Sequence, residues 1–105
     1  MDLYYDKDIK ESYDLIDELA SNKNLEMVAS VYDCNSAKVA GGYCSALKIA
    51  STNITNFPLI ECICKHCNHL GIDTGNATNS DIENVLKFVT KIRLNMRILL
   101  QYSPT

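Results

Sequence analysis

The chain has 105 residues, of which 47% are hydrophobic and 22% charged, and its formal net charge is −3. These values exclude a disordered or fibrous chain, and the length suits a single domain over residues 1–105. No run of 18 apolar residues is present, and the acidic N-terminus differs from a secretory signal. We therefore expect a cytoplasmic protein, and the ten Asn and ten Ile residues are typical of an AT-rich bacterial or viral genome.

Charge is distributed unevenly along the chain. Residues 1–33 carry nine acidic and three basic side chains, a net charge of −6, whereas the remainder has a net charge of +3. An asymmetry of this kind can steer a basic partner toward one end of a protein.

The first predicted element is a helix from residue 8 to about residue 20, with an apolar face that includes Tyr13 and Ile16. Acidic residues recur on another face of this helix at helical spacing. They give a predicted partner-binding surface, with two tyrosines as aromatic anchors, made of Glu11, Asp14, Asp17, Glu18, Tyr4 and Tyr5. The alternative is that the acids only maintain solubility and that the tyrosines cap the core.

The next two segments differ in how clearly they predict structure. Asn24 is suited to cap a second helix that runs to about Tyr32. Over residues 36–51 the apolar residues have helical spacing, and a helix in which Gly41-Gly42 permits a close crossing is favoured. A β-hairpin that turns at the same glycine pair is the alternative.

A further helix is predicted from residue 58 to residue 70. Pro58 suits its first position, and Gly71 suits its C-terminal cap. Its apolar face would consist of Ile60, Ile63, Cys64, Cys67 and Leu70. Since cysteine often behaves as a small buried hydrophobe, we expect Cys64 and Cys67 to fill the core.

The same segment carries a candidate zinc site. Cys62, His66 and His69 lie at i, i+4 and i+7 of the predicted helix, and Cys34 or Cys44 could supply a fourth ligand. Zinc sites usually pair two short ligand motifs, and only one dense segment is present here. No metal or cofactor is therefore expected, and a zinc-stabilised helical module is the alternative function. Without an export signal, the five cysteines are expected to be free thiols.

Two short motifs match catalytic signatures in an unsuitable context. The Cys64-x-x-Cys67 spacing occurs in thiol oxidoreductases, but here it lies within a predicted helix. Asp73-Thr74-Gly75 matches the triplet of aspartic proteases, but it lies in a loop between predicted helices and is better explained as a turn. No catalytic residue is therefore predicted.

The last predicted helix runs from residue 80 to residue 101. Ser80-Asp81-Ile82-Glu83 has the form of a capping box, and a long apolar stripe follows it. The basic residues of this helix could contact phosphates, but the negative net charge argues against a nucleic-acid partner.

These elements predict an all-α fold, a small bundle of four to five helices. An α+β fold with a hairpin around Gly41-Gly42 is the alternative. The predicted function is that of a non-enzymatic acidic inhibitor that blocks another protein with a basic surface, for example an immunity protein or antitoxin that neutralises a basic toxin. Neither a membrane nor a nucleic acid is expected as a partner.

Overall fold

A computed structural model describes residues 3–102 of the chain, with side chains from residue 10 onward. It contains helices and strands in regular alternation. They are α1 (Leu3–Asn22), β1 (Val28–Ser30), α2 (Cys34–Ala40), β2 (Ala46–Ile49), the 3₁₀ turn η1 (Ser51–Asn53), α3 (Phe57–Cys64), β3 (His69–Asp73), α4 (Asn79–Ile92) and β4 (Arg97–Gln101). The fold is therefore α/β, and the predicted all-α bundle is wrong.

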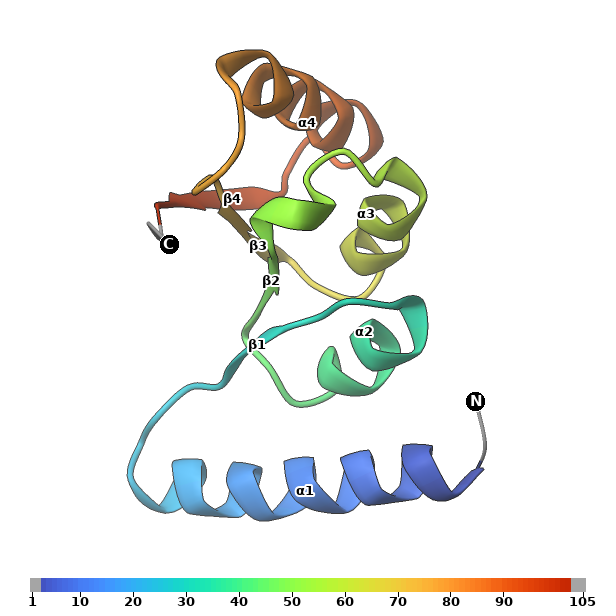
Figure 1. Cartoon of the computed structure of the whole chain (residues 1–105). Coiled ribbons are helices and arrows are strands. Elements are labelled where there is room, and N and C mark those ends of the chain that lie inside the picture. The colour runs from blue at the N-terminus through green and yellow to red at the C-terminus, as the bar shows by residue number, and fades with distance from the viewer. Residues whose placement is uncertain (1–2, 103–105) are drawn as a thin grey trace.

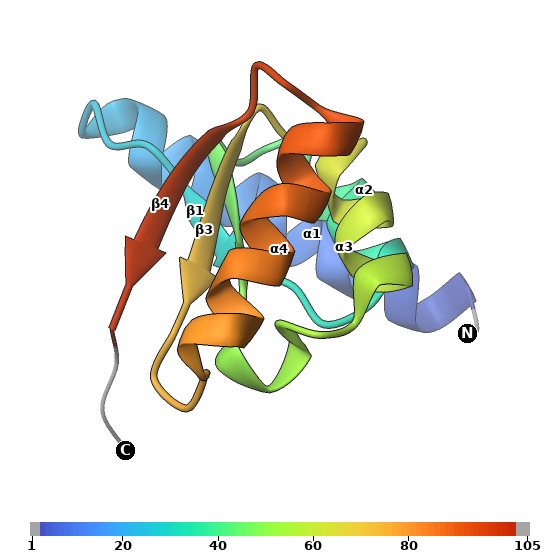
Figure 2. The same cartoon turned by 90° about the horizontal axis from the view of Figure 1, so that it is seen from above.

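The four strands form one parallel sheet in the order β1-β2-β3-β4. Neighbouring parallel strands need a crossover connection, and α2, α3 and α4 provide the three crossovers. Figures 1 and 2 show these helices on one side of the sheet, while the other face carries no helix. The strands lie in the sheet in the same order as in the chain, and helices cover only one face. This arrangement resembles half of an eight-stranded β/α barrel.

The hairpin alternative is also wrong, because β1 and β2 run parallel. Gly41 is the C-cap of α2, and the chain then turns toward β2. A Cβ added at Gly41 would lie 2.8 Å from Cβ of His66, in the loop between α3 and β3. The close approach expected at the glycine pair therefore exists at Gly41, but the segment around it is a short helix followed by a strand.

The three other predicted helices after residue 24 also include a strand of the sheet. The helix predicted over 58–70 ends at Cys64, and the chain becomes extended in β3. The helix predicted over 80–101 ends at Ile92, and β4 follows. The segment that begins at Asn24, which has a φ of 55°, leads into β1 instead of a helix. The starts of α3 and α4 are close to the predicted positions.

Side-chain caps fix the starts of these two helices. The Asn56 side chain accepts a hydrogen bond from the Leu59 amide at 3.3 Å, and Pro58 occupies the first turn of α3. α4 begins with a capping box made by Thr78 and Asp81, two residues before the predicted one. No helix in the described part of the chain has the length and hydrophobicity needed to span a bilayer.

The core lies between the sheet and the helices α2 to α4. It includes Leu47, Ile49, Leu70 and Ile72 from the strands, together with Ile60, Ile63, Val85 and Val89 from the helices. Cys64 and Cys67 are buried among them, which confirms their predicted packing role. Burial raises the pKa of the Cys64 thiol to about 11 and also raises that of Cys67.

A disulfide joins Cys34, at the start of α2, to Cys62 in α3, with a Cα–Cα distance of 5.8 Å. The expectation of free thiols is therefore wrong for this pair, while Cys44, Cys64 and Cys67 are free. The disulfide connects two neighbouring helices of the outer layer.

Candidate functional site: a groove on the open face of the sheet

The open face of the sheet carries side chains in rows that cross the strands. Strand residues alternate between the two faces, so buried Leu47 and Ile49 place Lys48 on the open side. The strand register then determines which residues lie beside Lys48 on this face. The row of Lys48 contains Ser30, Lys48, Gly71 and Leu99, and the row before it contains Val28, Ala46, His69 and Arg97.

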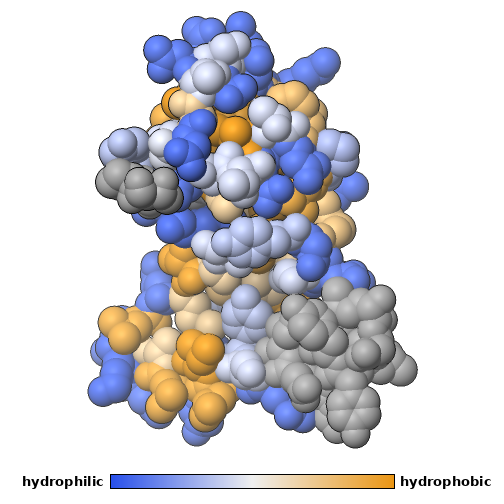
Figure 3. All heavy atoms as spheres, viewed as in Figure 1, coloured by the Kyte–Doolittle hydropathy of each residue, from blue (hydrophilic) through white to orange (hydrophobic). Residues whose placement is uncertain are grey.

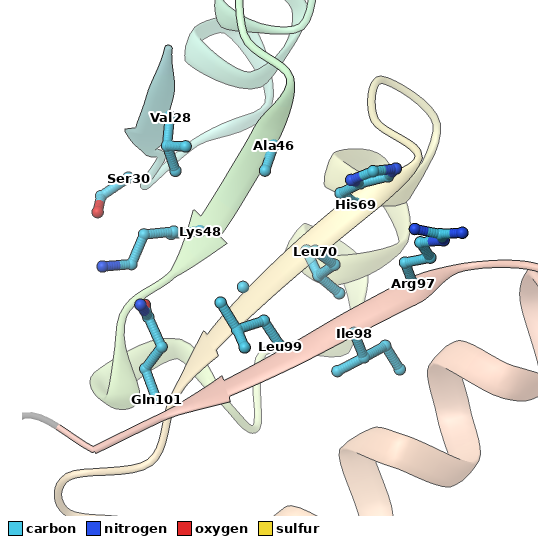
Figure 4. A pocket seen from close by; sticks show the side chains of 11 residues that line it. Val28, Ser30, Ala46, Lys48, His69, Leu70, Arg97, Ile98, Leu99 and Gln101 are labelled. Carbon is cyan, nitrogen blue, oxygen red and sulfur yellow. The ribbon is translucent and has the colours of Figure 1, made fainter. Parts of the chain in front are cut away.

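These two rows line a groove with a volume of about 510 Å³. This volume lies within the range of about 300 to 1,000 Å³ found for small-molecule sites. Figure 4 shows the lining side chains, which come from all four strands. They belong to Val28, Ser30, Ala46, Lys48, His69, Leu70, Gly71, Arg97, Ile98, Leu99 and Gln101.

Lys48 depends on the glycine beside it in the sheet. Gly71 is the register partner of Lys48, and a Cβ added at Gly71 would lie 2.9 Å from Cγ of Lys48. The absence of a side chain at Gly71 therefore leaves the space that the lysine stem occupies. The Lys48 side chain is half-buried and lines the groove.

Gln101, in β4, offers an unsatisfied hydrogen-bond acceptor to the same groove. Its Oε1 atom is buried, and among the described side chains it is the one buried polar atom without a hydrogen-bond partner. In Figure 4 the side chains of Gln101 and Lys48 extend toward the same region of the groove. A buried acceptor without a donor is destabilising, so a donor from a ligand would improve the energetics of this site.

The Asp73-Thr74-Gly75 segment holds the carboxyl ends of β3 and β4 together. The backbone N–H and the hydroxyl of Thr74 donate to the Gln101 carbonyl oxygen at 2.7 and 2.9 Å. The Gly75 amide donates to Oδ1 of Asp73 at 3.0 Å. Ligands of parallel α/β folds bind at the carboxyl ends of the strands, so this segment lies at the functional end of the sheet.

His69 and Arg97 lie at the opposite, amino-terminal end of the groove. They are register partners in β3 and β4, and Figure 4 shows both side chains near this end. Together with Lys48, Arg97 gives the groove a positive charge that favours an anionic ligand.

The five candidate zinc ligands do not come together. Cys34 and Cys62 are bonded to each other, and His69 lies in the groove. His66 packs near Gly41, and Cys44 lies in the loop before β2. Among the side chains described, no group of three His, Cys, Asp or Glu residues could hold a metal ion.

The predicted partner-binding surface lies on α1. Glu11, Asp14 and Glu18 are exposed, and Asp17 is half-buried. Asp14 accepts a hydrogen bond from the Tyr43 hydroxyl, which raises the pKa of Tyr43. The side chains of Tyr4 and Tyr5 lie outside the described part of the chain, and a partner-binding role for this surface stays a prediction.

Comparison with known families decides between an inhibitor and an enzyme. The model of the NeuB family matches residues 6–103. The chain belongs to the NeuB family. This is an enzyme family of the sialic acid synthase type, so the predicted non-enzymatic inhibitor, with its immunity-protein and antitoxin examples, is wrong. The zinc-stabilised module offered as the alternative is also wrong, because Cys34 and Cys62 form a disulfide and no three possible ligands lie together among the described side chains. A comparison with curated proteins finds no match for the chain.

The groove residues Lys48 and Gln101 were not predicted from the sequence. One signal was present at Lys48, a lone basic residue inside the short apolar run Ala46–Ile49. Such a residue points to a strand with one face that is not covered by the core. For Gln101 no comparable signal was available, because its role depends on strands that are distant in the sequence.

Proposed function

We propose that the groove is a substrate-binding site of a sialic acid synthase-type enzyme and that Lys48 binds an anionic group of the sugar substrate or product. The family match supports the reaction class. Sialic acid is a sugar acid, and a half-buried ammonium group forms strong, charge-assisted hydrogen bonds with a carboxylate.

Each groove residue has a role that follows from its chemistry. Lys48 neutralises the negative charge of the ligand. Gln101 accepts a hydrogen bond from a sugar hydroxyl or amide, which satisfies its buried Oε1 atom. Ser30, the register partner of Lys48, offers a hydroxyl to the polar edge of the ligand. The observation that carries the proposal is that Lys48 and the unsatisfied Gln101 line one groove.

Titration calorimetry with sialic acid tests this proposal on the wild-type chain and on Lys48→Met. Loss of a charge-assisted hydrogen bond costs about 1.5–3 kcal/mol, so Lys48→Met should weaken binding roughly tenfold to a hundredfold. Lys38→Met is the matched control, because Lys38 is exposed on α2 and does not line the groove. Equal affinities of Lys48→Met and the wild type would rule out the groove as the site.

A further inference from the structure

Hydrophobic and polar groups gather at different places on the molecule. Figure 3 shows hydrophobic side chains over the C-terminal part of α1 and the segment that leads to β1, where Leu19 and Leu25 are exposed. Apolar side chains offer no hydrogen bond to a hydroxylated ligand. Residues 73–76, at the carboxyl end of β3, are polar apart from Gly75, and they bond to the groove residue Gln101. This end of the sheet is therefore better suited to a polar ligand.

Thr74 has a fixed backbone within this segment. It directly follows β3, and its carbonyl oxygen accepts a hydrogen bond from the Ala77 amide at 3.2 Å. On either side of it, Oδ1 of Asp73 accepts a hydrogen bond from the Gly75 amide at 3.0 Å. The capping box of Thr78 then begins α4. Thr74 is thus held between a strand and a helix, and such support is what allows a side chain to position another group.

The Gln101 carbonyl oxygen accepts two hydrogen bonds from Thr74. The backbone N–H donates at 2.7 Å, one position beyond the last register pair of β3 and β4, which is Asp73 and Gln101. The Thr74 hydroxyl donates to the same oxygen at 2.9 Å. A carbonyl oxygen has two lone pairs and can accept both bonds. The backbone of Gln101 is therefore fixed at the point where its side chain leaves β4.

The position of the Gln101 side chain depends on this backbone. Its Oε1 atom is buried and has no hydrogen-bond partner in the described part of the chain, so no bond to a neighbour holds this acceptor in place. A glutamine side chain has several rotatable bonds, and ordering them on binding costs conformational entropy. A ligand binds more tightly when the acceptor is already in position.

We propose that Thr74 is a positioning residue for the ligand in the groove. Its hydroxyl holds the Gln101 backbone so that Oε1 meets a hydroxyl or amide N–H group of the sugar. This inference rests on the proposed function, because it concerns the same groove. It divides recognition between Lys48, which binds the anionic group, and the Thr74–Gln101 pair, which selects a ligand that carries a hydrogen-bond donor.

Calorimetry with sialic acid on single and double variants tests this role. Thr74→Val removes the hydroxyl and should weaken binding roughly twofold to tenfold, the effect of one neutral hydrogen bond. Thr74→Ser keeps a hydroxyl and should restore most of that loss. In a Gln101→Ala background, Thr74→Val should have no further effect, because the group that it positions is absent. Additive losses in the double variant, or a Thr74→Val variant that binds like the wild type, would overturn the proposal.

Thr90→Val is the matched control. Thr90 is exposed on α4 and does not line the groove, so this variant should bind sialic acid like the wild type. If Thr90→Val lost as much affinity as Thr74→Val, the loss would not be specific to the groove, and the positioning role would be wrong.

A measurement on the free protein separates this inference from the proposed function. The NMR order parameter of the Gln101 side-chain amide reports how firmly the side chain is held. We expect Thr74→Val to lower this order parameter and Thr74→Ser to leave it close to that of the wild type. A wild type that does not bind sialic acid would refute the proposed function. Binding by the wild type, with an unchanged order parameter in Thr74→Val, would refute the positioning role alone.

Discussion

Gly71 and Lys48 form the pair on which the groove depends at the scale of single residues. Gly71→Ala would bring a methyl group to 2.9 Å from Cγ of Lys48, so the lysine stem must move. We predict severalfold weaker binding of sialic acid and a loss of about 1 kcal/mol in the free energy of unfolding. Calorimetry and urea unfolding measure the two effects.

Gly42→Ala serves as the control for this substitution. A Cβ at Gly42 would have its nearest neighbour, the Val39 carbonyl oxygen, at 3.5 Å, which is an ordinary contact. This variant should bind the ligand like the wild type. If Gly71→Ala also binds like the wild type, the position of Lys48 does not matter for binding.

Cys64 gives a pH prediction at the same scale. Burial raises the pKa of this thiol from 9.0 to about 11, so the folded state holds the proton more tightly than the unfolded state. The contribution of Cys64 to stability is therefore complete below pH 9 and is lost as the pH rises toward about 11. In urea unfolding, the wild type should lose more stability over this window than Cys64→Ala, and equal losses would contradict the assignment.

The disulfide acts at the scale of the secondary-structure elements. Cys34 and Cys62 are separated by 28 residues in the sequence, and their bond restricts the unfolded chain between α2 and α3. Reduction should lower the free energy of unfolding by about 2–4 kcal/mol. The double variant Cys34→Ser, Cys62→Ser should show the lower stability with and without reductant. A wild-type chain whose unfolding curve is unchanged by reductant would contradict this role.

The helix starts could be predicted from the sequence because caps are local signals. Pro58 and the Thr78–Asp81 region mark the beginnings of α3 and α4 in the structure. The C-terminal ends of these two helices were not predicted correctly, because the strands that follow them are short. β3 and β4 have five residues each, and their apolar residues continue the helical spacing of the preceding helix. In a strand of this length, the alternation of apolar and polar residues covers too few positions to be recognised.

A longer-range signal for the fold was nevertheless present. The N-cap residues Asp33, Asn56 and Thr78 follow one another at intervals of 23 and 22 residues. A short apolar run precedes each cap, and a helix follows it. Regular alternation of this kind is the pattern of a parallel α/β fold, and it outweighs the helical spacing found inside any one segment.

For the whole molecule, the uneven charge distribution along the sequence corresponds to a separation of charge between the two edges of the sheet. The acidic helix α1 lies beside β1, at one edge of the sheet, and α4, which contains Lys87 and Lys91, lies toward the other edge, formed by β4 (Figures 1 and 2). The acidic surface could be predicted from the sequence, but the enzyme family could not. The candidate site gathers single residues from four strands, and only the parallel sheet brings them together.

The proposed function requires that the open face of the sheet binds an anionic sugar through its groove. The most direct measurement is a map of backbone amide chemical shifts during titration with sialic acid. We predict the largest changes at Lys48, Gln101 and residues 73–75, around the carboxyl ends of the strands. Changes confined to the outer surfaces of the helices, with the strands unaffected, would contradict the claim.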